Sequence, residues 1–157
     1  PMEWAFRGPY VLRDRLGGLN AKDIAEMSPS AIEKAFSTKP ALHRFPGSMA
    51  KRTQALCQAL VEDYSGRAAT VWTTARTGEE LLARLEALPG FGTEKAKIFI
   101  ALLGKRLGVA PPGWKAVAKP FSDSEMRSVA DIYSPETLEA VRAWKKAQKA
   151  RGKSKAE

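Results

Sequence analysis

Helix start signals divide this sequence into short segments, and no strand pattern runs between them. Ser28-Pro29 and Ser134-Pro135 each place a capping hydroxyl before a proline at the first helical position. A proline is well tolerated there, because its missing N–H would have no helical partner anyway. Alternation of apolar and polar residues with a period of two never persists beyond a few positions. The sequence therefore predicts an all-α fold.

Apolar periodicity predicts eight helices joined mostly by short loops. Only the connections Ser65–Arg76 and Gly108–Phe121 are long. The predicted helices cover residues 2–16, 21–27, 29–37, 48–64, 78–87, 93–107, 123–131 and 135–150.

Local signals refine three of these helices. Pro9 is expected to kink or split the first one, because its ring removes a helical hydrogen bond. Thr77 with Glu80 and Ser122 with Glu125 fit the capping box, in which each side chain satisfies the other's backbone N–H. These pairs predict helix starts near residues 78 and 123.

The charge of the chain indicates a polyanionic partner. The formal net charge is +9, and residues 145–157 contribute +5 of it, which leaves +4 (9 − 5) for the rest. We expect a helical domain over 1–144 and a basic tail over 145–157. The tail is either a solvated, frayed end or a further contact with the polyanion.

Few residues are available for cofactors or for a membrane. Cys57 is the single cysteine, which excludes an internal disulfide and a four-cysteine zinc or iron–sulfur site. We expect Cys57 to be an inert core thiol and His43, the single histidine, to support no metal site. The longest apolar run, Ile98–Leu103, is far too short to span a bilayer. The sequence thus predicts a cytoplasmic protein with no cofactor and no metal.

The start of the sequence is unusual. Pro1 leads at once into MEWAF, an apolar helix start that has no capping residue. We therefore expect that residues upstream of Pro1 are missing from this chain.

A glycine-rich break, LPGFGTEKAK, runs from Leu88 to Lys97. Pro89 ends the preceding helix, and Gly90 and Gly92 allow a positive φ and the close approach of another backbone. Thr93 is expected to cap the following helix. Lysines occupy the first turns of that helix, where the helix dipole disfavours cations.

An anion beside this turn would attract these lysines and so offset the cost of placing cations at the start of a helix. Backbone amides at a helix N-terminus form a ready anion site. We therefore predict a phosphate contact made by Gly90, Phe91, Gly92, Thr93, Lys95 and Lys97. A tight helix–helix turn with incidental lysines is the alternative.

A second break, FPGSMAKR at 45–52, has the same arrangement. A Pro-Gly pair interrupts the chain, a helix is predicted from Ser48, and two cations fall in its first turn. Arg52 and Lys95 each lie six residues after their prolines. We predict a second phosphate contact made by Arg44, Gly47, Ser48, Lys51 and Arg52, with simple solvation of Lys51 and Arg52 as the alternative.

The two breaks together resemble the DNA glycosylase superfamily that includes endonuclease III. Its helix–hairpin–helix pattern is close to L-P-G-V-G-x-K-T-A, and residues 88–96 here read LPGFGTEKA. Upstream, DIAEMSPSAIEKAF and HRFPGSMAKRTQALCQALVEDYSG resemble the short helices, the GF-x-x-x-K-A turn and the long helix of the family. The resemblance covers residues 1–110 or so, and the whole is similar to HhH-GPD-type base-excision repair proteins of actinobacteria.

This resemblance implies two helical lobes with a cleft. Hairpin amides would hold a phosphate of bent double-stranded DNA while a damaged or mismatched base is flipped into the cleft. It implies a monomeric, nucleoid-associated DNA repair enzyme that binds DNA mostly through phosphates.

The catalytic residue of this family is an aspartate about twenty residues beyond the second hairpin glycine, where it stabilises charge or activates the nucleophile. That place here is Pro111–Trp114, which holds no carboxylate. The candidates downstream are Asp131, with a capping carboxylate as the alternative, and Asp123, which a first-turn acid explains better.

Bifunctional family members carry a Schiff-base lysine two residues past the second glycine. Glu94 holds that position here, and Lys95 lies one residue late. The resemblance therefore implies a monofunctional glycosylase without an iron–sulfur cluster, in which water attacks the sugar. Two alternatives stay open: a non-catalytic helix–hairpin–helix DNA-binding protein that has lost the aspartate, and an RNA- or ribosome-associated protein bound through its basic tail.

Overall fold

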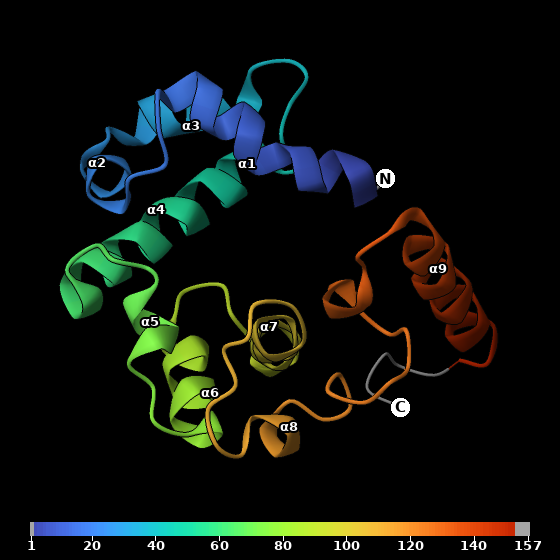
Figure 1. Cartoon of the computed structure of the whole chain (residues 1–157). Coiled ribbons are helices and arrows are strands. Elements are labelled where there is room, and N and C mark those ends of the chain that lie inside the picture. The colour runs from blue at the N-terminus through green and yellow to red at the C-terminus, as the bar shows by residue number, and fades with distance from the viewer. Residues whose placement is uncertain (1, 153–157) are drawn as a thin grey trace. The chain divides into compact units, whose positions relative to one another are not determined.

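The computed structural model describes residues 2–152, and all regular structure in that range is helical (Figure 1). The prediction of an all-α fold is therefore confirmed. In chain order the elements are α1 (Met2–Leu16), α2 (Ala21–Glu26), α3 (Pro29–Ser37), α4 (Pro46–Tyr64), α5 (Thr70–Thr73), α6 (Gly78–Ala87), α7 (Thr93–Arg106), α8 (Trp114–Val117), the 3-10 helix η1 (Val129–Asp131) and α9 (Pro135–Ala150).

The chain divides into two compact units. The first takes in the chain up to Ala69 together with Leu88–Gly90, and the second takes in Thr70–Ala87 and the chain from Phe91 onward. In the first unit, α2 and α3 pack on α4, and α1 packs on α3. Its buried apolar residues include Leu12, Ile24, Ile32, Phe36, Ala50, Cys57 and Leu60.

The local sequence explains the helix starts of the first unit. Asn20 and Ser28 cap α2 and α3 by accepting hydrogen bonds from the amides of Lys22 (2.9 Å) and Ala31 (3.3 Å). The predicted Ser28 cap is thus confirmed. Helix α1 runs without a break through Pro9, so of the two expected effects, a kink or a split, the split does not occur.

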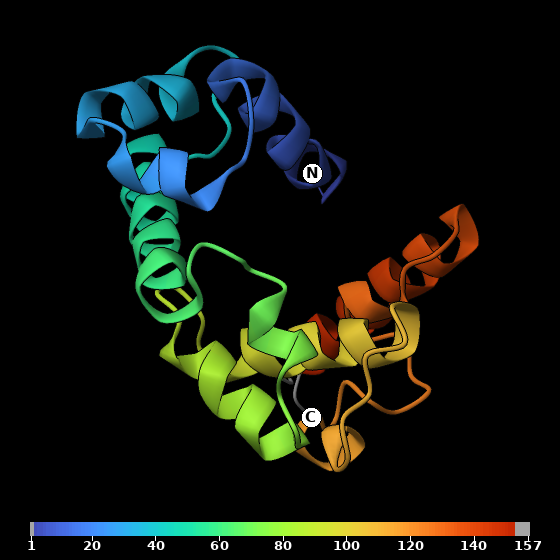
Figure 2. The same ribbon diagram turned by 60° about the vertical axis from the view of Figure 1, so that its left-hand side comes forward.

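The second unit is built around α7. Helices α6 and α8 and the turn η1 all pack on it, and Figure 2 shows α6 and α8 beside α7. Its buried face consists of Ala96, Ile100, Ala101 and Leu103. The Trp114 ring lies against Gly104, where a Cβ would come within 2.6 Å of it. Glycine is therefore needed at residue 104 for close packing.

Three elements differ from the predictions in the second unit. The long connections contain the short helices α5 and α8, and the predicted helix over 123–131 is reduced to η1. Side chains take the backbone groups that a helix would pair: Lys105 donates to the Asp123 carbonyl (2.5 Å), and the Arg127 amide donates to Asp131 (3.1 Å). The predicted Ser122 cap is also wrong, because its hydroxyl donates to the Lys115 carbonyl.

Candidate nucleic-acid interface

Helix α6, which leads into the glycine-rich break, begins close to its predicted cap. Thr77 accepts a hydrogen bond from the Glu80 amide (3.1 Å), as expected. The reciprocal bond differs, because the Glu80 carboxylate accepts from the Arg76 amide (2.8 Å) rather than from Thr77. This backbone hydrogen bond, helped by Arg84 at 2.6 Å, lowers the pKa of Glu80 below its usual range.

The two glycines of the turn play different structural roles. Gly90 adopts φ of +84°, as predicted for a glycine. Gly92 is the N-cap of α7 with φ of −103°, so a positive φ does not explain the glycine there. A Cβ built on either glycine would meet no atom within 4 Å beyond its own chain neighbours. The surface of the turn is therefore open.

The beginning of α7 corrects the predicted cap. Gly92 holds the cap position and Thr93 is the first helical residue, so no side chain caps α7. The first helical hydrogen bond joins the Ala96 amide to the Gly92 carbonyl (3.0 Å). The amides of Thr93 to Lys95 therefore form the positive end of the helix dipole.

Exposure separates the predicted phosphate-binding residues into two groups. Gly90, Gly92, Thr93 and Lys95 are exposed, whereas Phe91 and Lys97 are half-buried. The Phe91 ring packs edge-on against Phe99 (6.0 Å between centroids), and Phe99 packs in the same way against Trp72 (5.7 Å). Phe91 thus anchors the turn to α7, and Trp72 is engaged in packing.

The second break, at the start of α4, has a different environment. The helix begins at Pro46 rather than at Ser48, and no side chain caps it. Arg44, Ser48, Lys51 and Arg52 lie around this start. Arg44, Ser48, Lys51 and Arg52 are exposed, whereas Gly47 is half-buried.

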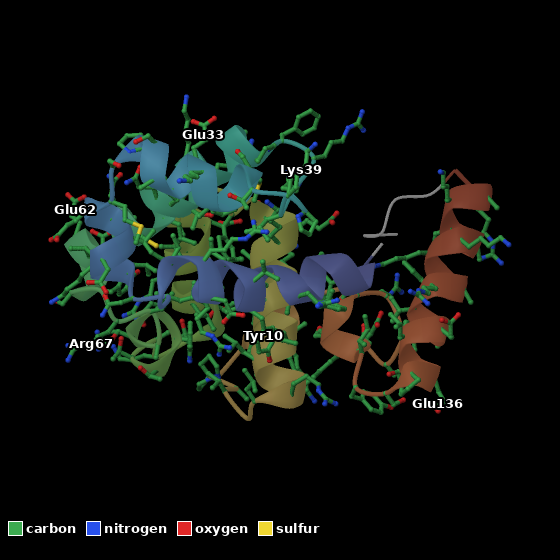
Figure 3. All side chains as sticks on the ribbon, turned by 90° about the horizontal axis from the view of Figure 1, so that it is seen from above. Tyr10, Glu33, Lys39, Glu62, Arg67 and Glu136 are labelled. Atoms are coloured by element: carbon green, nitrogen blue, oxygen red, sulfur yellow. The ribbon has the colours of Figure 1, made fainter. Side chains whose placement is uncertain are left out.

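A carboxylate already lies beside this start. A Cβ on Gly47 would stand 2.9 Å from Oε1 of Glu33, a residue of α3 labelled in Figure 3. An acid near a helix N-terminus complements its dipole, so Glu33 competes with an incoming anion at this position. Sequence reasoning missed Glu33, because the contact depends on how α3 packs on α4.

Asp131 is buried and fully engaged by donors. Its Oδ1 accepts from Lys105 Nζ (2.6 Å), and its Oδ2 accepts from the amides of Arg127 (3.1 Å) and Ser128 (2.9 Å). Ser128 and Asp131 form a capping box around η1. These contacts match the structural alternative for Asp131, that of a capping carboxylate.

Asp123 belongs to the same polar cluster. Its carboxylate accepts from the Glu125 amide (3.0 Å) and from Arg127 Nε (3.0 Å), which closes a turn. The predicted role as a first-turn acid is absent, because no helix starts there in the part of the chain described. Lys105, which sequence reasoning missed, links Asp123 to Asp131. The signal that could have found it is its position four residues after the buried Ala101, which places it on the inner face of α7.

Other groups that bear on chemistry have ordinary surroundings. Cys57 is buried as predicted, and burial raises the pKa of its thiol. Between residues 2 and 152, no three His, Cys, Asp or Glu side chains gather into a potential metal site. The helices in that same range are each too short or too polar to cross a bilayer.

The chain matches no protein-family model, and no curated protein or solved structure is significantly similar to it.

Proposed function

We propose that this protein binds double-stranded DNA through the turn between α6 and α7 and takes part in base-excision repair. The turn would present the amides at the start of α7 to one phosphate, with Lys95 beside it. Such a contact positions the protein on the duplex without reading its sequence.

Gly92 carries this proposal. Its φ of −103° suits any residue, and a Cβ there would meet no atom within 4 Å beyond its own chain neighbours. Neither backbone strain nor crowding therefore requires glycine at this N-cap, where serine or aspartate would serve at least as well, in contrast to Gly104, which is needed under Trp114. Close approach of an outside backbone to the α7 amides supplies that reason.

Replacing Gly92 tests the contact. Gly92→Val should abolish binding to a fluorescently labelled duplex in anisotropy titrations, because its side chain would cover the amides. Lys95→Ala should lower the slope of log K against log salt by about one unit, since one phosphate contact is lost. Thr38→Val, an exposed change in the first unit, is the control and should leave the affinity unchanged. Unaltered binding by Gly92→Val would refute the proposal.

We infer further that the DNA-bound protein removes a damaged or mismatched base as a monofunctional glycosylase. The resemblance of residues 88–96 to the glycosylase hairpin supports this step, and Glu94 at the Schiff-base position favours water as the nucleophile. Incubation with duplexes that carry single lesions, followed by alkali, would reveal abasic sites. Strand breaks without alkali would contradict the monofunctional mechanism.

A non-catalytic DNA-binding protein is the second candidate, and the surroundings of Asp131 favour it. A carboxylate held by Lys105 and two backbone amides is not available to a sugar. Tight DNA binding without abasic sites on any lesion would decide for this candidate. Abasic sites formed by the full chain would decide against it.

A further inference from the structure

Helix α9 carries two distinct faces. Thr137 and Val141 are buried, and Trp144 and Gln148 are half-buried at the next positions along the same side. The Trp144 ring stacks with the Arg127 guanidinium (5.1 Å to the centroid), and α9 packs on η1. This face fixes the helix to the second unit, so residues 145–150 are part of an ordered helix.

The other face is cationic. Arg142, Lys145, Lys146 and Lys149 recur at i, i+3, i+4 and i+7, which aligns them along one side of the helix. Arg151 follows at the C-cap. Residues 139–152 hold five cations and one acid, Glu139, for a net charge of +4 (5 − 1).

Two ordinary explanations cover only part of this face. Cations near a helix C-terminus complement its dipole, but that effect is confined to the last turn and so accounts for Lys149 and Arg151 alone. A merely solvated face usually mixes charges of both signs. Here like charges repeat at i, i+3 and i+4, and Glu139, which pairs with Arg142, is the single acid among residues 139–152.

We propose that the cationic face of α9 binds the phosphate backbone of duplex DNA as a second contact, in addition to that of the α6–α7 turn. Arg142 to Lys149 span about 10 Å of helix, a length over which duplex DNA carries about six phosphate charges. A lipid surface suits this helix less well, because membrane-binding helices insert an apolar face, and that face of α9 packs within the second unit. The choice of DNA as the partner rests on the proposed function, whereas the α9 contact is made by other residues than those of the α6–α7 turn.

The test compares two variants of the full chain with equal loss of charge. Lys145→Gln/Lys146→Gln/Lys149→Gln removes the cationic face, and Lys34→Gln/Lys39→Gln/Lys119→Gln removes three exposed lysines elsewhere. Binding to an undamaged duplex is measured by anisotropy over a salt series. The slope of log K against log salt should fall by about 2 to 3 units for the α9 variant, at about 0.9 per phosphate contact, and by much less for the control. Equal slopes for the two variants would overturn the inference.

A charge-preserving variant guards against misfolding. Lys145→Arg/Lys146→Arg/Lys149→Arg should keep the full slope, and a loss of slope in that variant would also overturn the inference. Tighter binding to duplex RNA or to vesicles containing phosphatidylserine would overturn the choice of DNA. The two proposals fail separately. If Gly92→Val loses binding while the α9 variant keeps the full salt slope, only the inference on α9 is refuted. If Gly92→Val binds normally while the α9 variant loses slope, only the hairpin contact is refuted.

Discussion

The buried pair of Lys105 and Asp131 gives the sharpest stability prediction. Asp131 is 6% exposed, and the Lys105 side chain is 19% exposed. In Asp131→Asn the new NH₂ group must face either the Lys105 ammonium or the amides of Arg127 and Ser128, all of which are donors. At least one donor is left unpaired in either orientation, and two backbone donors are left unpaired where the NH₂ group faces the amides. In both cases the Lys105 charge is left buried without its counter-ion.

The expected cost is large. Removing one partner of a buried ion pair costs about 3–5 kcal/mol, and we expect about 3 kcal/mol because Lys105 keeps some access to water. With an m-value of about 2 kcal/mol per M, the urea midpoint should fall by about 1.5 M. Tryptophan fluorescence reports this transition well, since Trp72, Trp114 and Trp144 all belong to the second unit.

Two further variants decide whether the ion pair is the cause. Glu139→Gln makes the same acid-to-amide change in the exposed pair with Arg142 and should cost at most about 1 kcal/mol. Lys105→Met/Asp131→Asn should recover more than half of the lost stability, because the amide oxygen introduced at position 131 can then face the two backbone amides while the NH₂ group avoids a cation. An Asp131→Asn midpoint equal to that of Glu139→Gln would refute the structural role of Asp131.

Three more predictions concern packing and pH. Gly104→Ala should lower the free energy of unfolding by about 1–2 kcal/mol in thermal denaturation, despite the higher helix propensity of alanine, because its Cβ would lie 2.6 Å from Trp114. Gly92→Ala meets no such clash and should cost at most about 1 kcal/mol, because alanine is a poorer N-cap than glycine. Burial raises the pKa of Cys57, so its labelling by a disulfide reagent should be limited by unfolding, and stability should fall as pH rises above the ordinary thiol pKa, with a smaller fall in Cys57→Ala. The backbone hydrogen bond that lowers the pKa of Glu80 contributes stability above the unfolded pKa, which is lost as pH falls through the folded pKa. Glu80→Gln should therefore show a shallower loss of stability in urea titrations taken from neutral to acidic pH, and equal pH slopes would contradict this.

Signals that act within one or two helical turns were sufficient to predict most of the fold. The Ser28 and Ser134 caps each depend on an oxygen that reaches an amide three residues ahead, so the sequence alone locates them. The prediction of a helix over 123–131 was wrong for the opposite reason. Lys105, from another element, takes a backbone carbonyl in that segment, and a sequence pattern does not reveal such a long-range competitor.

The candidate site shows the same division. The sequence located the turn between α6 and α7 and the positive φ of Gly90, because both follow from local backbone chemistry. It assigned a cap to Thr93 although Gly92 occupies that place, an error of one residue at a helix end. The approach of Glu33 to the start of α4 could not be predicted in this way, since that contact depends on how two helices pack.

The residues considered for DNA binding and for catalysis are different in this chain, and so are their surroundings. The turn at Gly92 is exposed and has room for a larger N-cap residue, which is the condition expected of a surface kept open for a ligand. Asp131 is buried instead, and its carboxylate accepts hydrogen bonds from Lys105 and from the Ser128 amide, which hold the fold together. A change at Gly92 should therefore alter DNA affinity with only a small change in stability, and a change at Asp131 should alter stability first. If Asp131→Asn instead abolished base excision at an unchanged urea midpoint, the carboxylate would be catalytic, and the ion pair with Lys105 would have to open when DNA binds.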